Sequence, residues 1–166
     1  DTNERRGIFF TKLTGCDSYD SIKSLKADID DIDIFVIASS TNTHLKILNE
    51  IIQDYSPKVV LCEKPLSYNL VESIKIIEIC QKNKIELFIN LPRRIEHSVG
   101  VMKKLIQTPK YFKGTVWYSN GAINNGIHFI DIITYLFGSS KKIDLISKNH
   151  EYVERKDFDA DFKLSY

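Results

Sequence analysis

Three polar clusters in this 166-residue chain combine residue types that can move protons or hold a small ligand. The clearest is Glu63-Lys64-Pro65, which directly follows the apolar run Val59–Cys62. A charge at the end of a buried strand needs partners, and a lysine whose pKa is lowered by desolvation can donate or accept a proton. The proline fixes the next turn, and its peptide bond can be cis or trans. An ordinary surface pair of Glu63 and Lys64 is the alternative.

The second cluster is the run NNGIHFID, residues 124–131. We expect His128 at or just before the N-terminus of a helix, where the helix dipole disfavours the protonated imidazole and suits the ring to accept a proton. Asp131 follows within one helical turn. A purely structural histidine is the alternative, and it is the default interpretation of the other histidines.

The third cluster is SSTNTH, residues 39–44, which follows the apolar run Ile34–Ala38. Its hydroxyl and amide side chains are typical of residues that cap the N-terminus of a helix. Backbone amides and hydroxyls at such a place can equally meet the phosphate or ribose of a cofactor. Both interpretations remain open on the sequence alone.

Alternating strands and helices are predicted for the first half of the chain. The runs IFVIA, VVLC and LFI are continuously apolar, as expected of parallel strands that are covered on both faces. The expected strands are Ile34–Ala38, Val59–Cys62 and Leu87–Ile89. Helical patterns cover roughly residues 18–28, 41–55 and 67–83. The last has Ser67 as its expected N-cap and an apolar face of Leu70, Val71, Ile74, Ile77 and Cys80. This alternation predicts right-handed βαβ units and an α/β fold with a doubly wound parallel sheet.

The character of the sequence changes after Pro92. We expect a helix at about 95–106, a strand in KGTVWYS (113–119), and a helix from His128 to Phe137 that Gly138 ends. Weak strand patterns follow at 143–146 and 151–155. The prediction is therefore a nucleotide-binding type of sheet over residues 1–91 and the start of a second α+β domain over 92–166.

Composition excludes several classes of function. Hydrophobic residues make up 43% of the chain, charged residues 27%, and the net charge is +1, so nucleic acid or an anionic membrane is not the expected partner. No apolar run has the length of a membrane span. Three cysteines without a C-x-x-C spacing favour thiols in a reducing cytosol over a disulfide or a metal site, which predicts a cytoplasmic protein without a metal.

The clusters in this order resemble the Gfo/Idh/MocA oxidoreductase family. The motifs are VIA-x-x-x-x-x-H, then LCEKPLS, then NNGIHFIDIITYLFG, within a resemblance that spans about residues 1–138. The resemblance implies an NAD(P)-binding Rossmann domain and a substrate domain. It also implies that Lys64 lies beside the nicotinamide and the substrate and that His128 is the acid/base. Asn124 takes the place of an acid in the family's catalytic motif, and an amide cannot titrate, so no proton relay can pass through it.

The resemblance also implies contacts for the cofactor and the substrate. An acid at Asp1 would bind the adenosine ribose and favour NAD over NADP, although Arg5 and Arg6 could pair with a 2′-phosphate. The expected cofactor contacts are Asp1, Ser39, Ser40, Asn42, His44, Glu63 and Lys64. The expected substrate contacts are Asn125, Asp131 and either Arg93 or Arg94, with Arg94 preferred.

The chain contains no G-x-G-x-x-G, the glycine loop that would be expected ~20 residues before Asp1. We therefore predict the middle of a longer enzyme that forms a homo-oligomer when full length. The leading hypothesis is hydride transfer between nicotinamide and a hydroxyl or carbonyl of a sugar or nucleotide sugar. One alternative is a non-catalytic sugar- or nucleotide-binding member, or an inactive fragment, of the same family. Another is an unrelated doubly wound domain with an accidental E-K-P.

Overall fold

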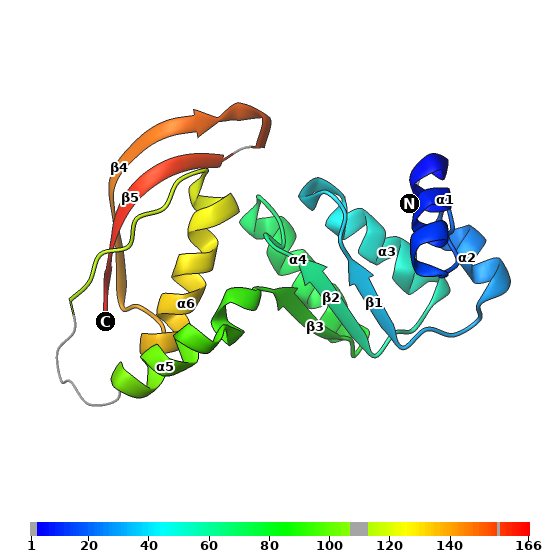
Figure 1. Ribbon diagram of the computed structural model, residues 1–166, viewed down its shortest axis with the longest axis horizontal. Coiled ribbons are helices and arrows are strands. Elements are labelled where there is room, and N and C mark those ends of the chain that lie inside the picture. The colour runs from blue at the N-terminus through cyan, green and yellow to red at the C-terminus, as the bar shows by residue number, and fades with distance from the viewer. Residues whose placement is uncertain (1–2, 107–112, 156) are drawn as a thin grey trace. The chain divides into compact units, whose positions relative to one another are not determined.

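The computed structural model describes residues 3–106, 113–155 and 157–166 (Figure 1). The chain forms two compact units. The first contains Asp1–Cys62 and Asn69–Phe88, and the second contains Glu63–Tyr68 and Ile89–Tyr166. Among the described residues, no helix combines the length and the apolar character needed to cross a membrane.

The first unit is built on three strands in the order β1-β2-β3. Their bounds are Ile34–Ile37, Val59–Glu63 and Glu86–Asn90. β1 and β2 pair in parallel, with Ile34 opposite Val59 and Ile37 opposite Cys62. Helices α3 (His44–Asp54) and α4 (Leu70–Lys82) connect successive strands. All three predicted strands are therefore confirmed to within two residues, and so is the α/β fold class.

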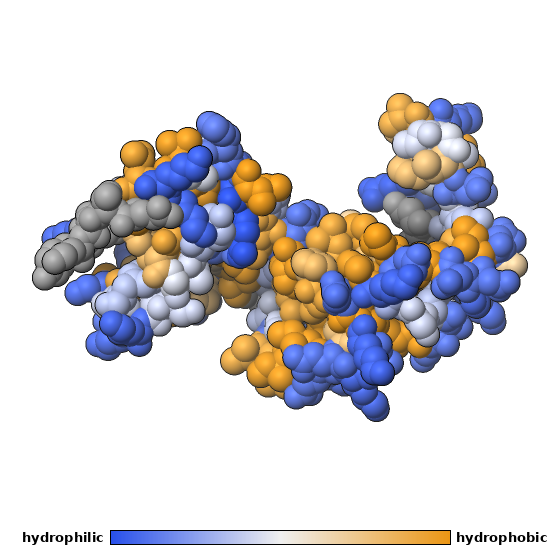
Figure 2. Space-filling view, turned by 90° about the horizontal axis from the view of Figure 1, so that it is seen from below, coloured by the Kyte–Doolittle hydropathy of each residue, from blue (hydrophilic) through white to orange (hydrophobic). Residues whose placement is uncertain are grey.

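Burial alternates along the strands, which differs from the expectation of cover on both faces. Phe35, Ile37, Val60 and Cys62 are buried, whereas the exposed fraction of Ile34 and Val36 is 60% each. α3 and α4 lie on the same face of the sheet (Figure 1). Figure 2 accordingly shows apolar side chains gathered on the surface around the sheet. The described helices cover one face only, so every other residue of the runs is less buried, and Ile34, Val36 and Phe88 are exposed.

Helix α4 corrects two predictions. Asn69, not Ser67, is its N-cap, because the Asn69 Oδ1 accepts the backbone N–H of Val71 at 2.8 Å. The buried residues are Ile76 and Cys80. The expected face is otherwise exposed: Leu70 by 76%, Val71 by 75%, Ile74 by 45% and Ile77 by 42%. Apolar residues occur all round this helix, so their spacing alone does not single out the packed face.

Two helices precede the sheet. α1 (Glu4–Thr14) was not predicted; it begins after the N-cap Asn3 and ends at Gly15, whose φ of 74° suits glycine. Its larger apolar residues lie in solvent: Ile8, Phe9, Phe10 and Leu13. No amphipathic pattern therefore marks it. α2 covers Ile22–Asp28, a shorter span than the predicted 18–28, because Ser21 and Ser24 form a capping box at its start.

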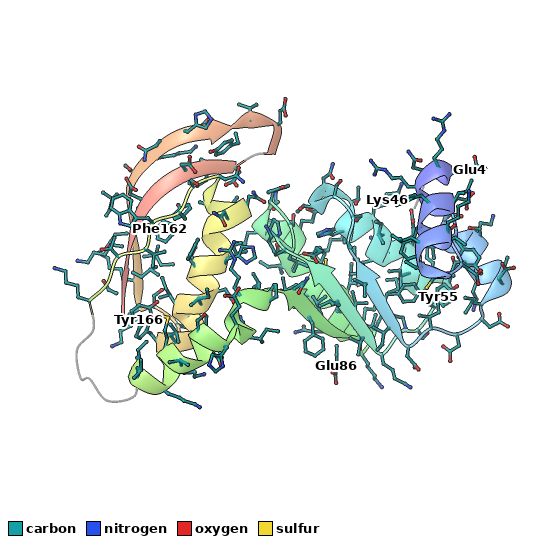
Figure 3. All side chains as sticks on the ribbon, in the orientation of Figure 1. Glu4, Lys46, Tyr55, Glu86, Phe162 and Tyr166 are labelled. Atoms are coloured by element: carbon teal, nitrogen blue, oxygen red, sulfur yellow. The ribbon has the colours of Figure 1, made fainter. Side chains whose placement is uncertain are left out.

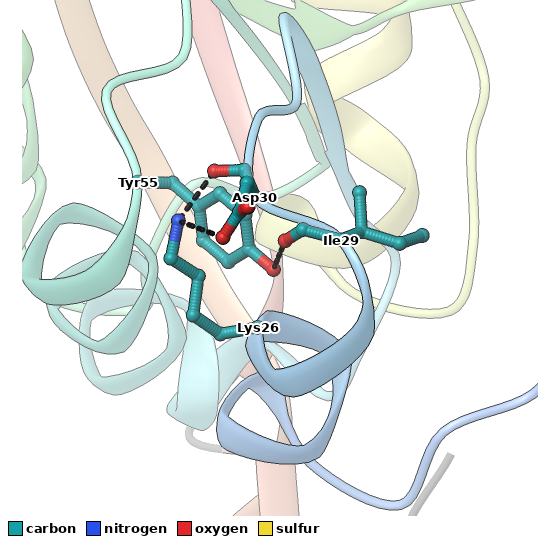
Figure 4. A network of polar contacts seen from close by, with 4 residues as sticks. All are labelled: Lys26, Ile29, Asp30 and Tyr55. Atoms are coloured by element: carbon teal, nitrogen blue, oxygen red, sulfur yellow. Dashed lines mark hydrogen bonds and ion pairs between the residues drawn. The ribbon is translucent and has the colours of Figure 1, made fainter.

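Tyr55 ties the end of α2 to the end of α3 (Figure 4). Its hydroxyl donates to the carbonyl oxygen of Ile29 at 3.0 Å, and its ring meets Phe35 edge-on at 5.0 Å between centroids. Lys26 lies over the ring and also hydrogen-bonds the carbonyl oxygen of Asp30. One buried aromatic side chain thus holds the chain segment that leads into β1.

The second unit joins two helices to a β-hairpin. It contains the 3-10 turn Pro92–Ile95, α5 (His97–Ile106), the π-helical turn Ala122–Gly126, α6 (Ile127–Phe137), β4 (Lys142–Tyr152), the 3-10 turn Val153–Arg155 and β5 (Asp157–Ser165). The helices predicted at 95–106 and from His128 to Phe137 are confirmed to within two residues. The first tail strand is longer than predicted and ends at Tyr152. The second strand, predicted at 151–155, is wrong, because these residues form the end of β4 and a 3-10 turn, and β5 begins only at Asp157.

The strand expected at 113–119 is wrong. Lys113–Ser119 forms no ladder within the described residues, and Trp117 is 88% exposed. Tyr118 attaches this segment, through a hydroxyl that donates to the Ala160 carbonyl at 2.5 Å and a ring that contacts Phe129 and Phe162. The Ser119 carbonyl oxygen also accepts a hydrogen bond from the Asn125 Nδ2 at 2.8 Å. A second aromatic pair, Phe137 and Tyr166, joins α6 to the end of the chain; Figure 3 labels Phe162 and Tyr166. Alternating residue types resemble a strand, but a strand also needs a partner that pairs with its backbone.

Substitution of Tyr55 by phenylalanine should lower the free energy of unfolding by about 1 kcal/mol. The change removes one buried hydroxyl donor and leaves the Ile29 carbonyl without it, while the aromatic packing stays. Chemical denaturation measures the loss, with Tyr68→Phe as a control that also removes one phenolic hydroxyl. An unfolding free energy equal to wild type would show that the hydrogen bond does not hold α2 to α3.

Candidate active site

Lys64 stands directly after β2 and is held by the turn before α6. Its Nζ donates to the Asn124 carbonyl oxygen at 2.7 Å and lies 3.3 Å from the Asn124 Oδ1. The Lys64–Pro65 peptide bond is cis. Lys64 and Asn124 are 60 residues apart in the sequence but belong to the same compact unit. The interpretation of Glu63-Lys64 as a simple surface pair therefore does not describe this lysine, whose ammonium is bound by two oxygens of one residue.

His128 is the buried polar residue of α6. It is 8% exposed, and within the described part of the chain its Nδ1 has no hydrogen-bond partner. Buried polar atoms are nearly always bonded, so an unpaired ring nitrogen here suits a ligand that would bind it. His128 is the second residue of α6, which confirms its predicted place at a helix N-terminus, although the π-helical turn Ala122–Gly126 directly precedes this helix.

The pKa of His128 is lowered from the ordinary histidine value. Burial is the largest cause, since it disfavours the charged ring; the positive charges of Arg93 and Lys64 add to it, and Glu63 opposes it. At neutral pH the imidazole is therefore neutral and able to accept a proton. The dipole of a helix N-terminus is not needed to explain this.

Glu63 and Asn90 join the ends of β2 and β3. The Asn90 Nδ2 donates to the Glu63 Oε1 at 2.6 Å. The Glu63 carboxylate is thus bound by a residue at the end of β3, whereas the neighbouring Lys64 ammonium is bound by Asn124. Asn90 was not among the predicted site residues, although a polar residue at the end of an apolar strand is the signal that could have identified it.

The two neighbouring arginines lie in different surroundings. Arg94 forms a two-point ion pair with Asp131, one bond of which measures 2.9 Å from Nε to Oδ2. Arg93 donates to the Asn125 Oδ1 at 3.3 Å and lies over the ring of Phe129. Of the predicted substrate contacts, Arg94 and Asp131 therefore bind one another. Arg93, bound only to a neutral amide among these contacts, contributes its charge to the surroundings of His128.

The predicted cofactor contacts after β1 belong to the first unit. Ser39 and Ser40 are exposed, and the Ser39 hydroxyl lies 2.8 Å from that of Thr43. His44 is 1% exposed; its Nδ1 is 3.3 Å from the Cys62 Sγ and its Nε2 is 3.2 Å from the Ser39 carbonyl oxygen. This placement favours the structural interpretation of His44.

Asn42 is exposed in the 3-10 turn Thr41–Thr43 and lines a shallow hollow of about 550 Å³ over α3. Asp1, the expected ribose acid, lies outside the described residues. A second hollow, of about 260 Å³, lies against α5 and includes Arg94 and Tyr135. Neither hollow includes Lys64 or His128. The case for a site at these two residues is therefore made by their hydrogen bonds and burial, and not by a deep cavity.

The chemistry of the cluster fits the reacting end of a nicotinamide cofactor and a hydroxyl substrate. A fixed ammonium can donate to an oxygen atom, and a neutral buried imidazole with an unpaired nitrogen can accept the proton of a hydroxyl. Among the described residues, no group of three histidine, cysteine or acidic side chains is placed to bind a metal ion. All three cysteines are free thiols.

Comparisons with known proteins relate the chain to oxidoreductases. The family model described as "Oxidoreductase family, NAD-binding Rossmann fold" (GFO_IDH_MocA) matches residues 1–91. The myo-inositol 2-dehydrogenase of Thermotoga maritima is 34% identical over 76 residues, which cover 46% of this chain and 22% of that protein.

Solved structures share the fold at low sequence identity. An oxidoreductase from Agrobacterium radiobacter, in complex with NAD+, L-tartaric acid and magnesium, aligns with a TM-score of 0.79 at 16% identity, covering 99% of this chain and 53% of that one. The UDP-N-acetylglucosamine 3-dehydrogenase GnnA of Acidithiobacillus ferrooxidans aligns with a TM-score of 0.73 at 20% identity, covering 98% and 56%. The chain thus spans about half the length of these two structures.

The imidazole of His128 should titrate below the ordinary histidine range, and Arg93→Gln should raise its pKa. Removal of a nearby positive charge favours the protonated ring. NMR of the imidazole nitrogens against pH measures both values. Because the unfolded chain takes up a proton first as pH falls below about 6.5, this residue should also lower stability in that window. Arg94→Gln is the matched control, since Arg94 is paired with Asp131. An unchanged His128 titration in Arg93→Gln would show that Arg93 does not tune it.

Proposed function

The chain belongs to the Gfo/Idh/MocA oxidoreductase family, which has an NAD-binding Rossmann fold, and from this premise we propose that it is an NAD(P)-dependent oxidoreductase of sugars or nucleotide sugars. The reaction is the interconversion of a hydroxyl and a carbonyl group. NAD is favoured over NADP, in keeping with the description of the family.

One observation carries this proposal. Lys64, a fixed ammonium donor, and His128, a neutral imidazole with an unpaired buried nitrogen, occur in one compact unit, close enough for the lysine's charge to lower the pKa of the histidine. Oxidation of a hydroxyl needs a base for its proton and a donor for its oxygen. These two side chains supply both.

Each residue has a separate part in the proposed mechanism. The cofactor, when bound, supplies the hydride acceptor or donor at its nicotinamide ring. His128 takes the hydroxyl proton in oxidation and returns it in reduction. Lys64 donates to the substrate oxygen and polarises the developing carbonyl. Asn124 holds the lysine without titrating, so its role is to orient the ammonium and not to relay a proton.

The cofactor contacts proposed here are Ser39, Ser40 and Asn42, with Asp1, Glu63 and Lys64 as predicted from the resemblance. The three residues after β1 are exposed, so their hydroxyl and amide groups are accessible to a ligand. His44 is the weakest of the proposed contacts, because both its ring nitrogens face atoms of the protein. The simpler role of His44 is structural: it links Ser39, which follows β1, to Cys62 in β2.

The substrate class follows from the relatives and from the charges. An inositol dehydrogenase and a dehydrogenase named for UDP-N-acetylglucosamine both act on polyhydroxylated rings, according to their names. Arg93 is proposed as the contact for an anionic group, in preference to Arg94, and Asn125 orients it. The domains proposed are a Rossmann domain over 1–91 and a substrate domain over 92–166, in a protein that assembles as a homo-oligomer.

A second candidate is a member of the same family that binds sugar or nucleotide without catalysis. The amide at Asn124 motivates it, because that position cannot titrate. Binding of NAD without substrate-dependent reduction of NAD+, across a panel of sugars and nucleotide sugars, would favour this candidate. Reduction of NAD+ with any member of the panel would exclude it.

Lys64→Ala and His128→Ala should each lower kcat by about 100-fold or more in the full-length protein, because each removes one side of the proton-transfer chemistry. Stopped-flow or steady-state reduction of NAD+ measures the loss. Lys46→Ala and His150→Ala are the matched controls, since both side chains are exposed and lie outside the cluster. Wild-type turnover in both site variants would refute the proposed function.

A further inference from the structure

Asp157, the first residue of β5, is a buried acid whose carboxylate binds the turn before α6. It is 3% exposed. Its Oδ1 accepts the backbone N–H groups of Ile123 at 2.9 Å and Phe158 at 2.8 Å, and its Oδ2 accepts that of Asn124 at 2.9 Å. A charge buried to this extent needs such donors, and three backbone amides supply them. The first N–H groups of a helical segment lack acceptors within it, and Asp157 provides acceptors for two of them.

Gly121 permits this close approach. Its φ is 95°, and a Cβ at this position would lie 1.9 Å from the Asp157 Oδ2. Any side chain here would therefore displace the carboxylate, in addition to straining the backbone. A second acid of β5 holds the same residue, since the Asp159 Oδ1 accepts the Gly121 N–H at 2.8 Å. Two acids of one strand thus fix the start of the turn.

The turn fixed in this way carries the residue that binds Lys64. Asn124 donates its N–H to Asp157 and receives the Lys64 ammonium on its carbonyl oxygen and its Oδ1. The turn is π-helical, a form that is rare and is frequently found at functional sites. Two of the contacts that hold this turn from outside come from Asp157, which accepts the N–H groups of Ile123 and Asn124.

We infer that Asp157 is a positioning residue of the proposed reaction: it holds Asn124 so that Asn124 can hold the ammonium of Lys64. This inference rests on the proposed function, in which Lys64 donates to the substrate oxygen. It adds a residue 33 positions from Asn124 that never needs to touch substrate or cofactor.

The test is Asp157→Asn in the full-length protein. The amide keeps the shape of the side chain but replaces one acceptor oxygen by an NH2 group, which cannot accept an N–H. Hydrogen exchange measured by NMR should become faster at the amides of Ile123 and Asn124. The value of kcat should fall roughly 10-fold or more, since a displacement of about 1 Å at a reacting group costs up to ~100-fold. Asp161→Asn is the matched control: it removes the same charge from the same strand at an exposed position bound to Ser147.

A double-mutant cycle with Lys64→Ala separates positioning from a general structural effect. If Asp157 acts through Lys64, Asp157→Asn lowers kcat in the wild-type background and has almost no further effect in Lys64→Ala. Equal fold losses in both backgrounds, or unchanged exchange at Asn124, would overturn the inference. A normal turnover of Lys64→Ala would instead overturn the part that the proposed function gives to Lys64, and the role of Asp157 with it.

A second variant covers the case in which Asp157→Asn does not fold. Asp157→Glu keeps the charge and both acceptor oxygens but moves them by one methylene group. The same cycle with Lys64→Ala then applies, with a loss of kcat expected only when Lys64 is present. A kcat equal to wild type in a folded Asp157→Glu, together with unchanged exchange at Asn124, would show that the position of this carboxylate does not matter.

Discussion

The hydrogen bond from the Lys64 ammonium to Asn124 is the contact on which the site depends. An ammonium at the end of a β-strand loses hydration and must recover it from protein oxygens. The acid beside it, Glu63, is bound by Asn90. The oxygens come instead from a turn 60 residues away, at 2.7 Å and 3.3 Å. Because Asn124 is the partner of Lys64, the turn that carries Asn124 must be placed accurately for the ammonium to be held.

A neutral partner for the lysine has an electrostatic consequence. A carboxylate at position 124 would offset the charge of Lys64 and would favour protonation of His128. An amide does neither, so burial, Arg93 and Lys64 together lower the pKa of the histidine against Glu63 alone. The same positive charges would stabilise the negative charge that develops on a substrate oxygen when its proton leaves. An asparagine in place of an acid is therefore compatible with a base at His128, provided that the base passes its proton elsewhere than through Asn124.

Features that depend on neighbours in the chain could be predicted from the sequence. The three strands, α3, α6 and its end at Gly138 follow from apolar spacing and glycine placement, and the Gfo/Idh/MocA resemblance is confirmed by the family match. Features that are decided by tertiary contacts could not be predicted in this way. α1 has exposed apolar residues, and the packed face of α4 cannot be read from a helix that is apolar all round. Asp157 could not be selected either, because an acid in a segment without clear periodicity has no local sign that it binds a turn 33 residues earlier.

Arg93 and Arg94 show most clearly what residue type leaves undecided. They are adjacent and chemically identical, yet Arg94 forms a two-point ion pair with Asp131, whose negative charge offsets that of the arginine. Arg93 is bound by the neutral Asn125 and lies over the face of Phe129, so its charge acts on His128. A guanidinium that is paired with a carboxylate has fewer N–H donors and less net charge to offer an anionic ligand. A guanidinium that is hydrogen-bonded to an amide keeps most of its donors and its charge. If the substrate carries a phosphate or a carboxylate, its negative charge would offset that of Arg93, which lowers the pKa of His128, so substrate charge and proton transfer would be coupled through a single side chain.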